Sequence, residues 1–156
     1  MVGGERCYLP TTDHTAEGRL LDSSIVFAPI GYVENGFDEP AAPETIRAAE
    51  SRIVLRPELV EGLFGLEAGQ KLLVVFNFDR SVGFDLLQHP RGDRTRPKRG
   101  VFAVRSPRRP NAIGVTEVDI LSIDGNVLRV SGLDALNGTP VLDLKPVTPA
   151  APAAAS

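Results

Sequence analysis

Short apolar segments, separated by glycine, proline and polar residues, recur along most of this chain. The longest, at 71–78, reads Lys-Leu-Leu-Val-Val-Phe-Asn-Phe, and its nearly continuous apolar character predicts a central strand buried on both faces. Asp124-Gly125, between two apolar runs, predicts a two-residue hairpin turn. The other strands are predicted at 24–30, 52–55, 100–104, 114–123, 127–130 and 141–144.

Helical patterns are rare. At 57–66, Pro57 suits the first turn of a helix, Glu58 suits its dipole, and leucines recur on one face. A second short helix is predicted at 43–51. About seven strands with one or two short helices predict a mainly β chain, a small antiparallel β-barrel. The lack of βαβ alternation and of G-x-G-x-x-G after a strand excludes a Rossmann fold.

The length of 156 residues suits one domain with a real core. We expect a flexible N-terminal extension at 1–22, a barrel domain at 23–146 and a disordered tail at 147–156, because the tail holds only small residues and prolines after Val147 and Thr148. No apolar run approaches the roughly 20 residues that span a bilayer, so no membrane association is expected.

The chain holds one cysteine and two histidines, too few for most metal sites. Cys7 has no partner for an intramolecular disulfide, and the polar N-terminus shows no secretory signal, so the cytoplasm is the expected compartment. Neither His14 nor His89 sits at ligand spacing from another good ligand, so no metal is expected.

Charge is concentrated in one segment. Residues 91–110 carry eight basic side chains against one acid, a formal charge of +7, while the rest of the chain balances at −10. Within this segment Pro107 and Pro110 stiffen a loop that holds Arg105 between two predicted strands. A basic strip on an acidic body suits an anionic partner such as RNA, although a solvated basic loop is the alternative. The predicted RNA-binding residues are Arg94, Arg96, Lys98, Arg99, Arg108 and Arg109, with Arg91 widening the strip.

Three stretches, at 28–33, 99–114 and 133–146, resemble the TrmO (TsaA-like) family, as does 66–81. Members of that family are S-adenosylmethionine-dependent tRNA methyltransferases with a small β-barrel fold. The resemblance implies methylation of threonylcarbamoyladenosine beside the anticodon of tRNA, and a homodimer. The donor-binding residues that it implies are Pro43, Glu44, Thr45, Asp79, Arg80, Arg105, Val115, Asp134, Ala135, Leu136 and Asn137. The chain departs from the family pattern at 44–45, where an Arg-Gln pair is usual, and at 79, where His is common.

Methyl transfer from a sulfonium is an in-line displacement, for which the protein positions the acceptor and excludes water. No general base is evident, and the catalytic candidates are Asp79 and Asp134. Asp134 could equally brace its own turn through an Asx hydrogen bond. Two other functions stay open: methylation of a small molecule or another nucleoside, and a non-catalytic module that binds the donor or RNA. In every case we expect the basic loop and the Asp134 turn to converge at one rim of the barrel.

Overall fold

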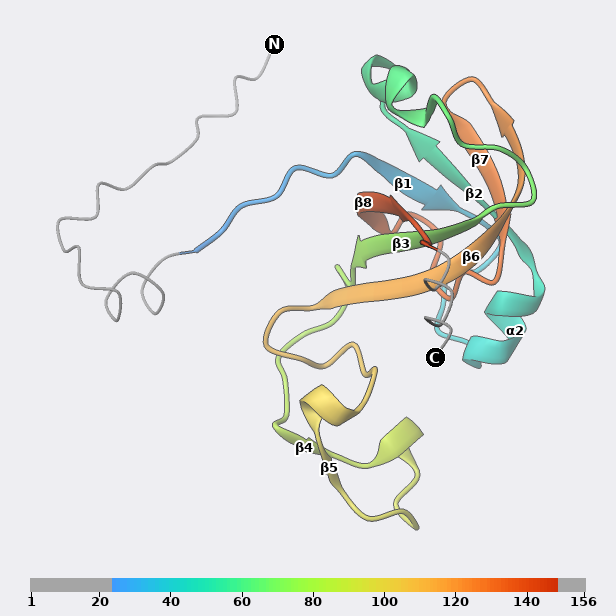
Figure 1. Cartoon of the computed structure of the whole chain (residues 1–156). Coiled ribbons are helices and arrows are strands. Elements are labelled where there is room, and N and C mark those ends of the chain that lie inside the picture. The colour runs from blue at the N-terminus through green and yellow to red at the C-terminus, as the bar shows by residue number, and fades with distance from the viewer. Residues whose placement is uncertain (1–23, 149–156) are drawn as a thin grey trace, which may run out of the picture.

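Strand β3 (Lys71–Asn77) pairs with β6 (Ile113–Asp124) on one side and with β8 (Pro140–Pro146) on the other. The most apolar segment of the chain is therefore central, as predicted. The structure is a computed structural model that describes residues 24–148. Its body is a closed antiparallel barrel with strand order β1-β2-β7-β6-β3-β8, which confirms the predicted fold class (Figure 1). The remaining barrel strands are β1 (Gly31–Glu34), β2 (Glu50–Leu55) and β7 (Val127–Ser131).

Alternating side chains fill the barrel interior. Val33, Ile53, Val74, Phe76 and Leu128 are each at most 1% exposed and belong to one apolar cluster. Glycine lets β1 and β2 approach closely, because a Cβ on Gly31 would lie 2.3 Å from a carbonyl oxygen of β2. The predicted hairpin between β6 and β7 is confirmed, but its two-residue turn is Gly125-Asn126, one residue later than predicted, because Asp124 still pairs with Val127.

Helical structure is confined to short turns. Helix α2 (Pro43–Ala48) covers one part of the barrel, within the range predicted for the second helix. The helix predicted at 57–66 is a 3₁₀ turn, η1 (Pro57–Leu63). None of the helices formed by residues 24–148 is long and apolar enough to cross a membrane.

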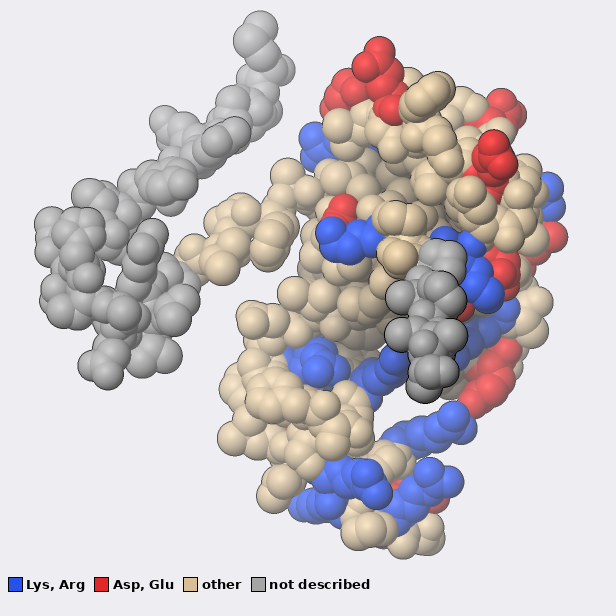
Figure 2. Space-filling model, in the orientation of Figure 1, with Lys and Arg blue, Asp and Glu red and all other residues tan. Residues whose placement is uncertain are grey.

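An arm formed by residues 81–111 projects from the barrel between β3 and β6 and lies at the bottom of Figure 1. We call it the basic arm. It holds a two-stranded sheet of β4 (Leu87–Gln88) and β5 (Arg99–Gly100), and the turns η2 (Pro90–Gly92) and η3 (Val101–Ala103). Figure 2 shows Lys and Arg gathered on this arm, while Asp and Glu lie mostly over the barrel.

Three strand predictions need correction. Residues 24–30 form no strand, because Pro29 has no N–H, and pairing starts with the Ile30 N–H that reaches the Val141 carbonyl. The strand predicted at 100–104 is the η3 turn instead, because β4 has only two residues and offers no longer partner. Phe102, in this turn, is 81% exposed. The second face of β3 is half-buried rather than buried.

The predictions for the two ends of the chain fall largely outside the described residues. The extension predicted at 1–22, with Cys7 and His14, lies there, as do residues 149–156 of the predicted tail. Val147, at the start of that predicted tail, donates its N–H to the Lys71 carbonyl at 3.3 Å and so continues from β8 along the start of β3.

Candidate donor and RNA site

The turn that follows β7, residues 134–138, carries a carboxylate held from two sides. We call it the rim turn. Asp134 accepts a short hydrogen bond on Oδ1 from the Thr116 hydroxyl of β6 and an ion pair on Oδ2 from Arg47 of α2, at 2.9 Å. Thr116 is buried, whereas the Asp134 side chain stays 22% exposed. A carboxylate fixed in this way still has free lone pairs, and it can accept a hydrogen bond from a ligand without changing its own position.

Arg80 ties the end of β3 to the rim turn. Its Nη1 donates to the Asp38 carbonyl and its Nη2 to the Asn137 carbonyl, both at 2.6 Å. The Asn137 amide also donates to the Asp38 carboxylate at 2.9 Å. One guanidinium therefore joins three segments that are far apart in sequence: the end of β3, the loop at 35–38 and the rim turn.

Asn35 supports the same turn from the barrel side. Its side-chain amide donates to the Ala135 carbonyl at 2.8 Å and to the Ser51 hydroxyl at 3.1 Å, and its backbone N–H reaches the Asn137 side chain at 3.2 Å. Ser51 is buried at 1% exposure, so this network is shielded from water. The rim turn is a fixed structure rather than a loose loop.

The base of the basic arm lies at the same end of the barrel as the rim turn. Arg80, directly before the arm, contacts the rim turn, and Ser81, the first residue of the arm, donates its hydroxyl to the Pro107 carbonyl of the same arm at 2.9 Å. Arg105, two residues before Pro107, is exposed and forms no ion pair with any residue from 24 to 148. The structure thus brings Arg80, Asp134 and Asn137 together and sets the loop of Arg105 beside them.

The other predicted donor residues lie less centrally. Pro43, Glu44 and Thr45 form the first turn of α2, one turn before Arg47. Asp79 is exposed, and Val115 is 45% exposed on the outward face of β6. Ala135 is buried and Leu136 is half-buried in the rim turn. None of these side chains bonds to the Asp134 carboxylate within the described part of the chain.

Glu44 instead connects α2 to the basic arm. Its carboxylate pairs with Arg91 at 3.0 Å, although both side chains are more than 60% exposed. Arg91 is also the one non-glycine residue in 24–148 with positive φ, at 56°. That conformation is uncommon for a long side chain and costs energy that the neighbouring contacts must offset.

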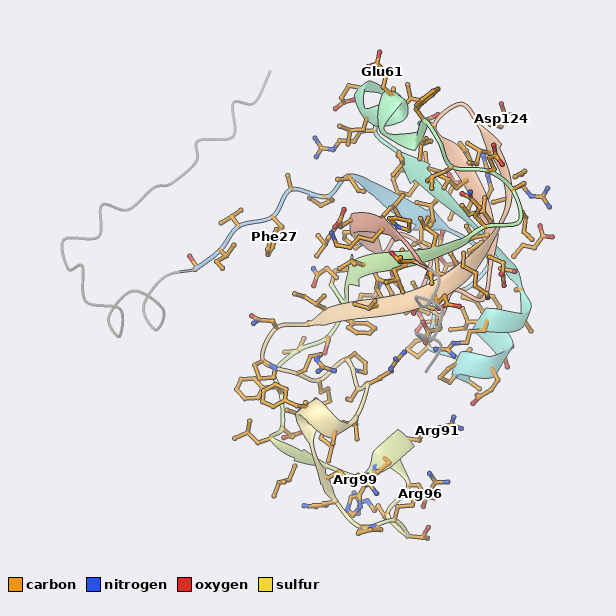
Figure 3. All side chains as sticks on the ribbon, viewed as in Figure 1. Phe27, Glu61, Arg91, Arg96, Arg99 and Asp124 are labelled. Atoms are coloured by element: carbon orange, nitrogen blue, oxygen red, sulfur yellow. The ribbon has the colours of Figure 1, made fainter. Side chains whose placement is uncertain are left out.

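The predicted RNA-binding residues divide into two groups. Arg108 pairs with Asp85 through Nε and Nη2, both at 3.1 Å, and Arg109 donates to the Val104 carbonyl at 3.1 Å. These two arginines, with Arg96 paired to Asp93 at 3.3 Å, already have partners inside the basic arm. Cationic side chains without an ion pair among residues 24–148 also occur on this arm: Arg94, Lys98 and Arg99. Figure 3 places Arg96 and Arg99 at the end of the arm distant from the barrel, whereas Arg91 reaches towards α2, where it pairs with Glu44.

A structured turn shapes this end of the arm. The Thr95 hydroxyl and backbone N–H both donate to the Asp93 carboxylate, at 2.6 and 3.0 Å. These bonds, with a further one from Arg96, lower the pKa of Asp93 from its ordinary value. Asp93 therefore stays ionised and holds the arginine-rich turn in shape.

Apolar side chains are exposed on the basic arm next to its charges. The exposed fractions are 82% for Val82, 50% for Phe84, 61% for Leu86, 62% for Leu87 and 81% for Phe102. Large apolar side chains that are exposed near one another are typical of an interaction surface.

Sequence inspection missed the residues that hold the rim turn. Arg47 is 87 positions from its partner Asp134, and Asn35 is 102 positions from Asn137. No spacing rule connects such distant positions. The one local signal was the Asn35-Gly36 pair, a common turn sequence, which marks a bend without naming its partner.

Comparison with known proteins agrees with this architecture. The profile of the tRNA-methyltransferase O N-terminal domain matches residues 32–153. A probable S-adenosyl-L-methionine-binding protein of Pyrococcus abyssi is 37% identical over 134 residues, which cover 83% of this chain and 72% of that protein. The human tRNA (adenine(37)-N6)-methyltransferase is 35% identical over 140 residues, 81% of this chain and 31% of that protein.

Solved structures extend the likeness to three dimensions. The crystal structure of TrmO from Pseudomonas aeruginosa matches with a TM-score of 0.64 and 34% identity, over 85% of this chain and 60% of that chain. This chain therefore spans three fifths of that TrmO chain and about a third of the human protein.

Proposed function

This chain belongs to the tRNA-methyltransferase O family, and on that basis we propose that it transfers a methyl group from S-adenosylmethionine to tRNA. One observation carries the proposal: Arg80, at the base of the basic arm, bonds to the rim turn, so the arm and the rim turn lie at one end of the barrel. The arm offers cationic side chains for RNA phosphates, and the rim turn offers a fixed carboxylate for a cationic donor.

The charges at this rim fit the donor. S-adenosylmethionine supplies, when bound, an electrophilic methyl carbon on a positively charged sulfur, and it also carries an ammonium and a carboxylate. Asp134, 22% exposed and fixed by Thr116 and Arg47, suits a positively charged group. Arg105, exposed and unpaired among the described residues, suits a carboxylate. The relatives named as S-adenosyl-L-methionine-binding proteins support this assignment.

For the acceptor we propose an adenosine of the tRNA anticodon loop, and more narrowly the threonylcarbamoyl-modified adenosine beside the anticodon. The mammalian relatives named for the N6 position of adenine 37 support the first part. The protein's task is to hold the acceptor nitrogen in line with the methyl carbon and to accept the proton that the nitrogen loses. Asp79, exposed at the end of β3 and adjacent to Arg80, is the candidate that is free of ion pairs in the described residues.

We propose further that the protein acts as a homodimer in the cytoplasm, where tRNA is available. The exposed apolar side chains of the basic arm support a second copy, because its docking would remove Phe84, Leu87 and Phe102 from water. A second copy set against this arm would also cover the open rim and exclude water from the transferring methyl.

The test is methyl transfer with a labelled donor. The full chain is incubated with trideuteromethyl S-adenosylmethionine and with tRNA that carries or lacks the threonylcarbamoyl group, and the digested nucleosides are analysed by mass spectrometry. A trideuteromethyl group on the modified adenosine is the expected result. Label on unmodified adenosine alone would correct the acceptor. Donor binding by calorimetry without transfer to any tRNA would reject the proposal and favour a small-molecule acceptor or a binding module.

A further inference from the structure

Residues 24–29 leave the barrel as an extended segment that belongs to no strand (Figure 1). We call this the leading segment. It exposes three consecutive large apolar side chains: Ile25 is 78% exposed, Val26 is 87% exposed and Phe27 is 62% exposed. Figure 3 shows Phe27 on this segment, apart from the barrel. Such a run of apolar side chains in water is unfavourable, and burying it would stabilise any structure that offers a fitting surface.

The edge of β8 next to this segment is open. β8 pairs with β3 from Val141 to Pro146, but with β1 through Pro140 and Val141 alone. Beyond that point, and within residues 24–148, no strand faces this edge. The Leu144 N–H donates instead to the carboxylate of its neighbour Asp143, at 2.9 Å. An open edge of this kind is a ready partner for an added strand.

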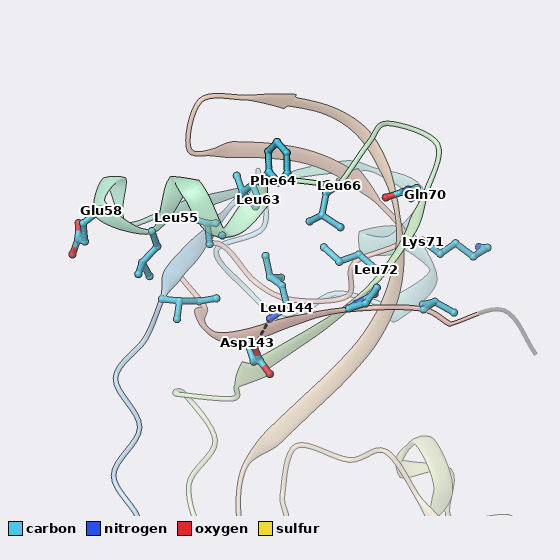
Figure 4. A pocket seen from close by; sticks show the side chains of 16 residues that line it. Leu55, Glu58, Leu63, Phe64, Leu66, Gln70, Lys71, Leu72, Asp143 and Leu144 are labelled. Carbon is cyan, nitrogen blue, oxygen red and sulfur yellow. Dashed lines mark hydrogen bonds between the residues drawn. The ribbon is translucent and has the colours of Figure 1, made fainter.

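An apolar groove runs beside the open edge. It has a volume of about 1080 Å³ and lies at the end of β3 opposite to the rim turn, between η1 and β8 (Figure 4). Leu55, Leu63, Leu72 and Leu144 line it, and so does Ile30, the residue that follows the leading segment by one position. The groove thus offers apolar contacts directly beside unpaired backbone groups.

The register of β1 shows how the leading segment would fit such a site. Gly31 pairs with Val141 and Tyr32 with Pro140, so the same register continued backwards would set residues 24–29 opposite 143–148. Beyond Val141 a bulge shifts the faces of β8, so that Leu144 and Pro146 share the inward face of Val74 and Leu72. Ala28 and Val26 would lie opposite these two residues and enter the groove beside Ile30, whereas Ile25 and Phe27 would lie on the outer face of the added strand.

We propose that the leading segment of one copy occupies the open β8 edge and the apolar groove of a second copy, in a reciprocal strand exchange. The proposal rests on the homodimer put forward above. The leading segment points away from the groove of its own chain, and the bend at Ile30 separates it from β1. Exchange between two identical chains would close both open edges at once, and it is a common route to symmetric dimers.

Cross-linking of the full chain tests the exchange. In a Cys7→Ser background, Phe27→Cys is combined with Lys145→Cys, its neighbour in the continued register. Facing residues of a strand pair are close enough for a disulfide or a short bismaleimide link. The matched control is Val26→Cys with Lys145→Cys, because residue 26 would face the opposite side. The expected result is a covalent dimer on a non-reducing denaturing gel, with a much weaker dimer band for the control.

A link within one chain, or no link, would overturn the exchange. A second measurement covers poor folding of the cysteine variants: Val26→Asp places a charge on the side chain that would enter the groove, so it should raise the dimer dissociation constant at least about tenfold by analytical ultracentrifugation. An unchanged constant would also overturn it. Methyl transfer to tRNA is measured on the same unlinked proteins, so a failed exchange in an active dimer would leave the proposed function standing.

Discussion

Replacing Arg80 tests whether the rim turn binds the donor. Its guanidinium makes two hydrogen bonds of 2.6 Å to the Asp38 and Asn137 carbonyls, and Arg80→Ala removes both. Hydrogen bonds from charged donors contribute about 1.5–3 kcal/mol each when buried, and Arg80 is exposed, so about 1 kcal/mol each is a reasonable expectation. Arg80→Ala should therefore destabilise the ordered conformation of the rim turn and of the loop at 35–38 by about 2 kcal/mol in total.

If the donor binds only the ordered rim, its dissociation constant should rise by roughly tenfold to thirtyfold, since 1.4 kcal/mol corresponds to a factor of ten. Isothermal titration calorimetry with S-adenosylmethionine measures this directly, and steady-state kinetics should show a raised donor KM. Arg80→Lys should retain part of the affinity, because one ammonium can reach one of the two carbonyls but lacks the planar fork.

Lys71→Ala is the matched control, because Lys71 lies at the opposite end of β3 and pairs with Glu117 and Asp119 at 3.2 and 3.1 Å. It removes one exposed cation from the same strand without touching the rim. Donor affinity should stay as in the parent protein. If Arg80→Ala binds the donor as tightly as the parent while remaining folded, the rim turn is not the donor site.

Four further variants address other parts of the structure. The first neutralises the cations of the basic arm that form no ion pair among residues 24–148: Arg94, Lys98 and Arg99. In a filter-binding series it should reduce the slope of log affinity for tRNA against log salt by about 2–3, because each lost phosphate contact removes roughly 0.7–0.9 from that slope. An unaltered slope would show that the RNA binds elsewhere. Thr116→Val keeps the shape of a buried side chain but removes the hydroxyl that donates a hydrogen bond to Asp134. The affinity for S-adenosylmethionine should therefore fall about threefold to tenfold in calorimetry. An equal affinity would show that this hydrogen bond does not support binding. Gly31→Ala should lower the free energy of unfolding by at least about 2 kcal/mol in urea, because its Cβ would lie 2.3 Å from a backbone oxygen, and a neutral effect would refute that close approach. The pKa of Asp93 lies below the ordinary 3.8, so the stabilisation that Asp93 gives the arm is present at neutral pH and is lost as the pH falls below about 4 through the lowered pKa. In an NMR titration, Thr95→Val should raise the pKa of Asp93 relative to the parent protein. An unchanged pKa would show that the Thr95 hydroxyl is not the main cause of the lowering.

The barrel was predictable because its strands carry local signals. The run at 71–78 and the Asp124-Gly125 pair predict a central strand and a hairpin, and both occur in the structure, with the turn of the hairpin shifted by one residue to Gly125-Asn126. The arm was not predictable in the same way. The apolar run at 100–104 satisfies a strand pattern, yet a strand also needs a partner, and the arm provides only β4.

The candidate site shows the same division. Arg105 and the acidic turn stood out through charge and motif, and the structure places both at one end of the barrel. The partners that fix Asp134 came from α2 and β6, and they meet it only after the barrel closes. The roles of Arg108 and Arg109 also depended on geometry. The sequence predicts both as RNA contacts, but in the structure Arg108 bonds to Asp85 and Arg109 bonds to the Val104 carbonyl.

The most direct test of the central claim is to locate the donor on the protein in solution. S-adenosylmethionine is titrated into the ¹⁵N-labelled full chain, and the amide shifts are followed by NMR. We expect saturable shifts in the loop at 35–38, in residues 79–81 and in the rim turn at 134–138. Shifts confined to η1 and the apolar groove, around Leu63 and Leu72 at the other end of the barrel, would contradict that claim.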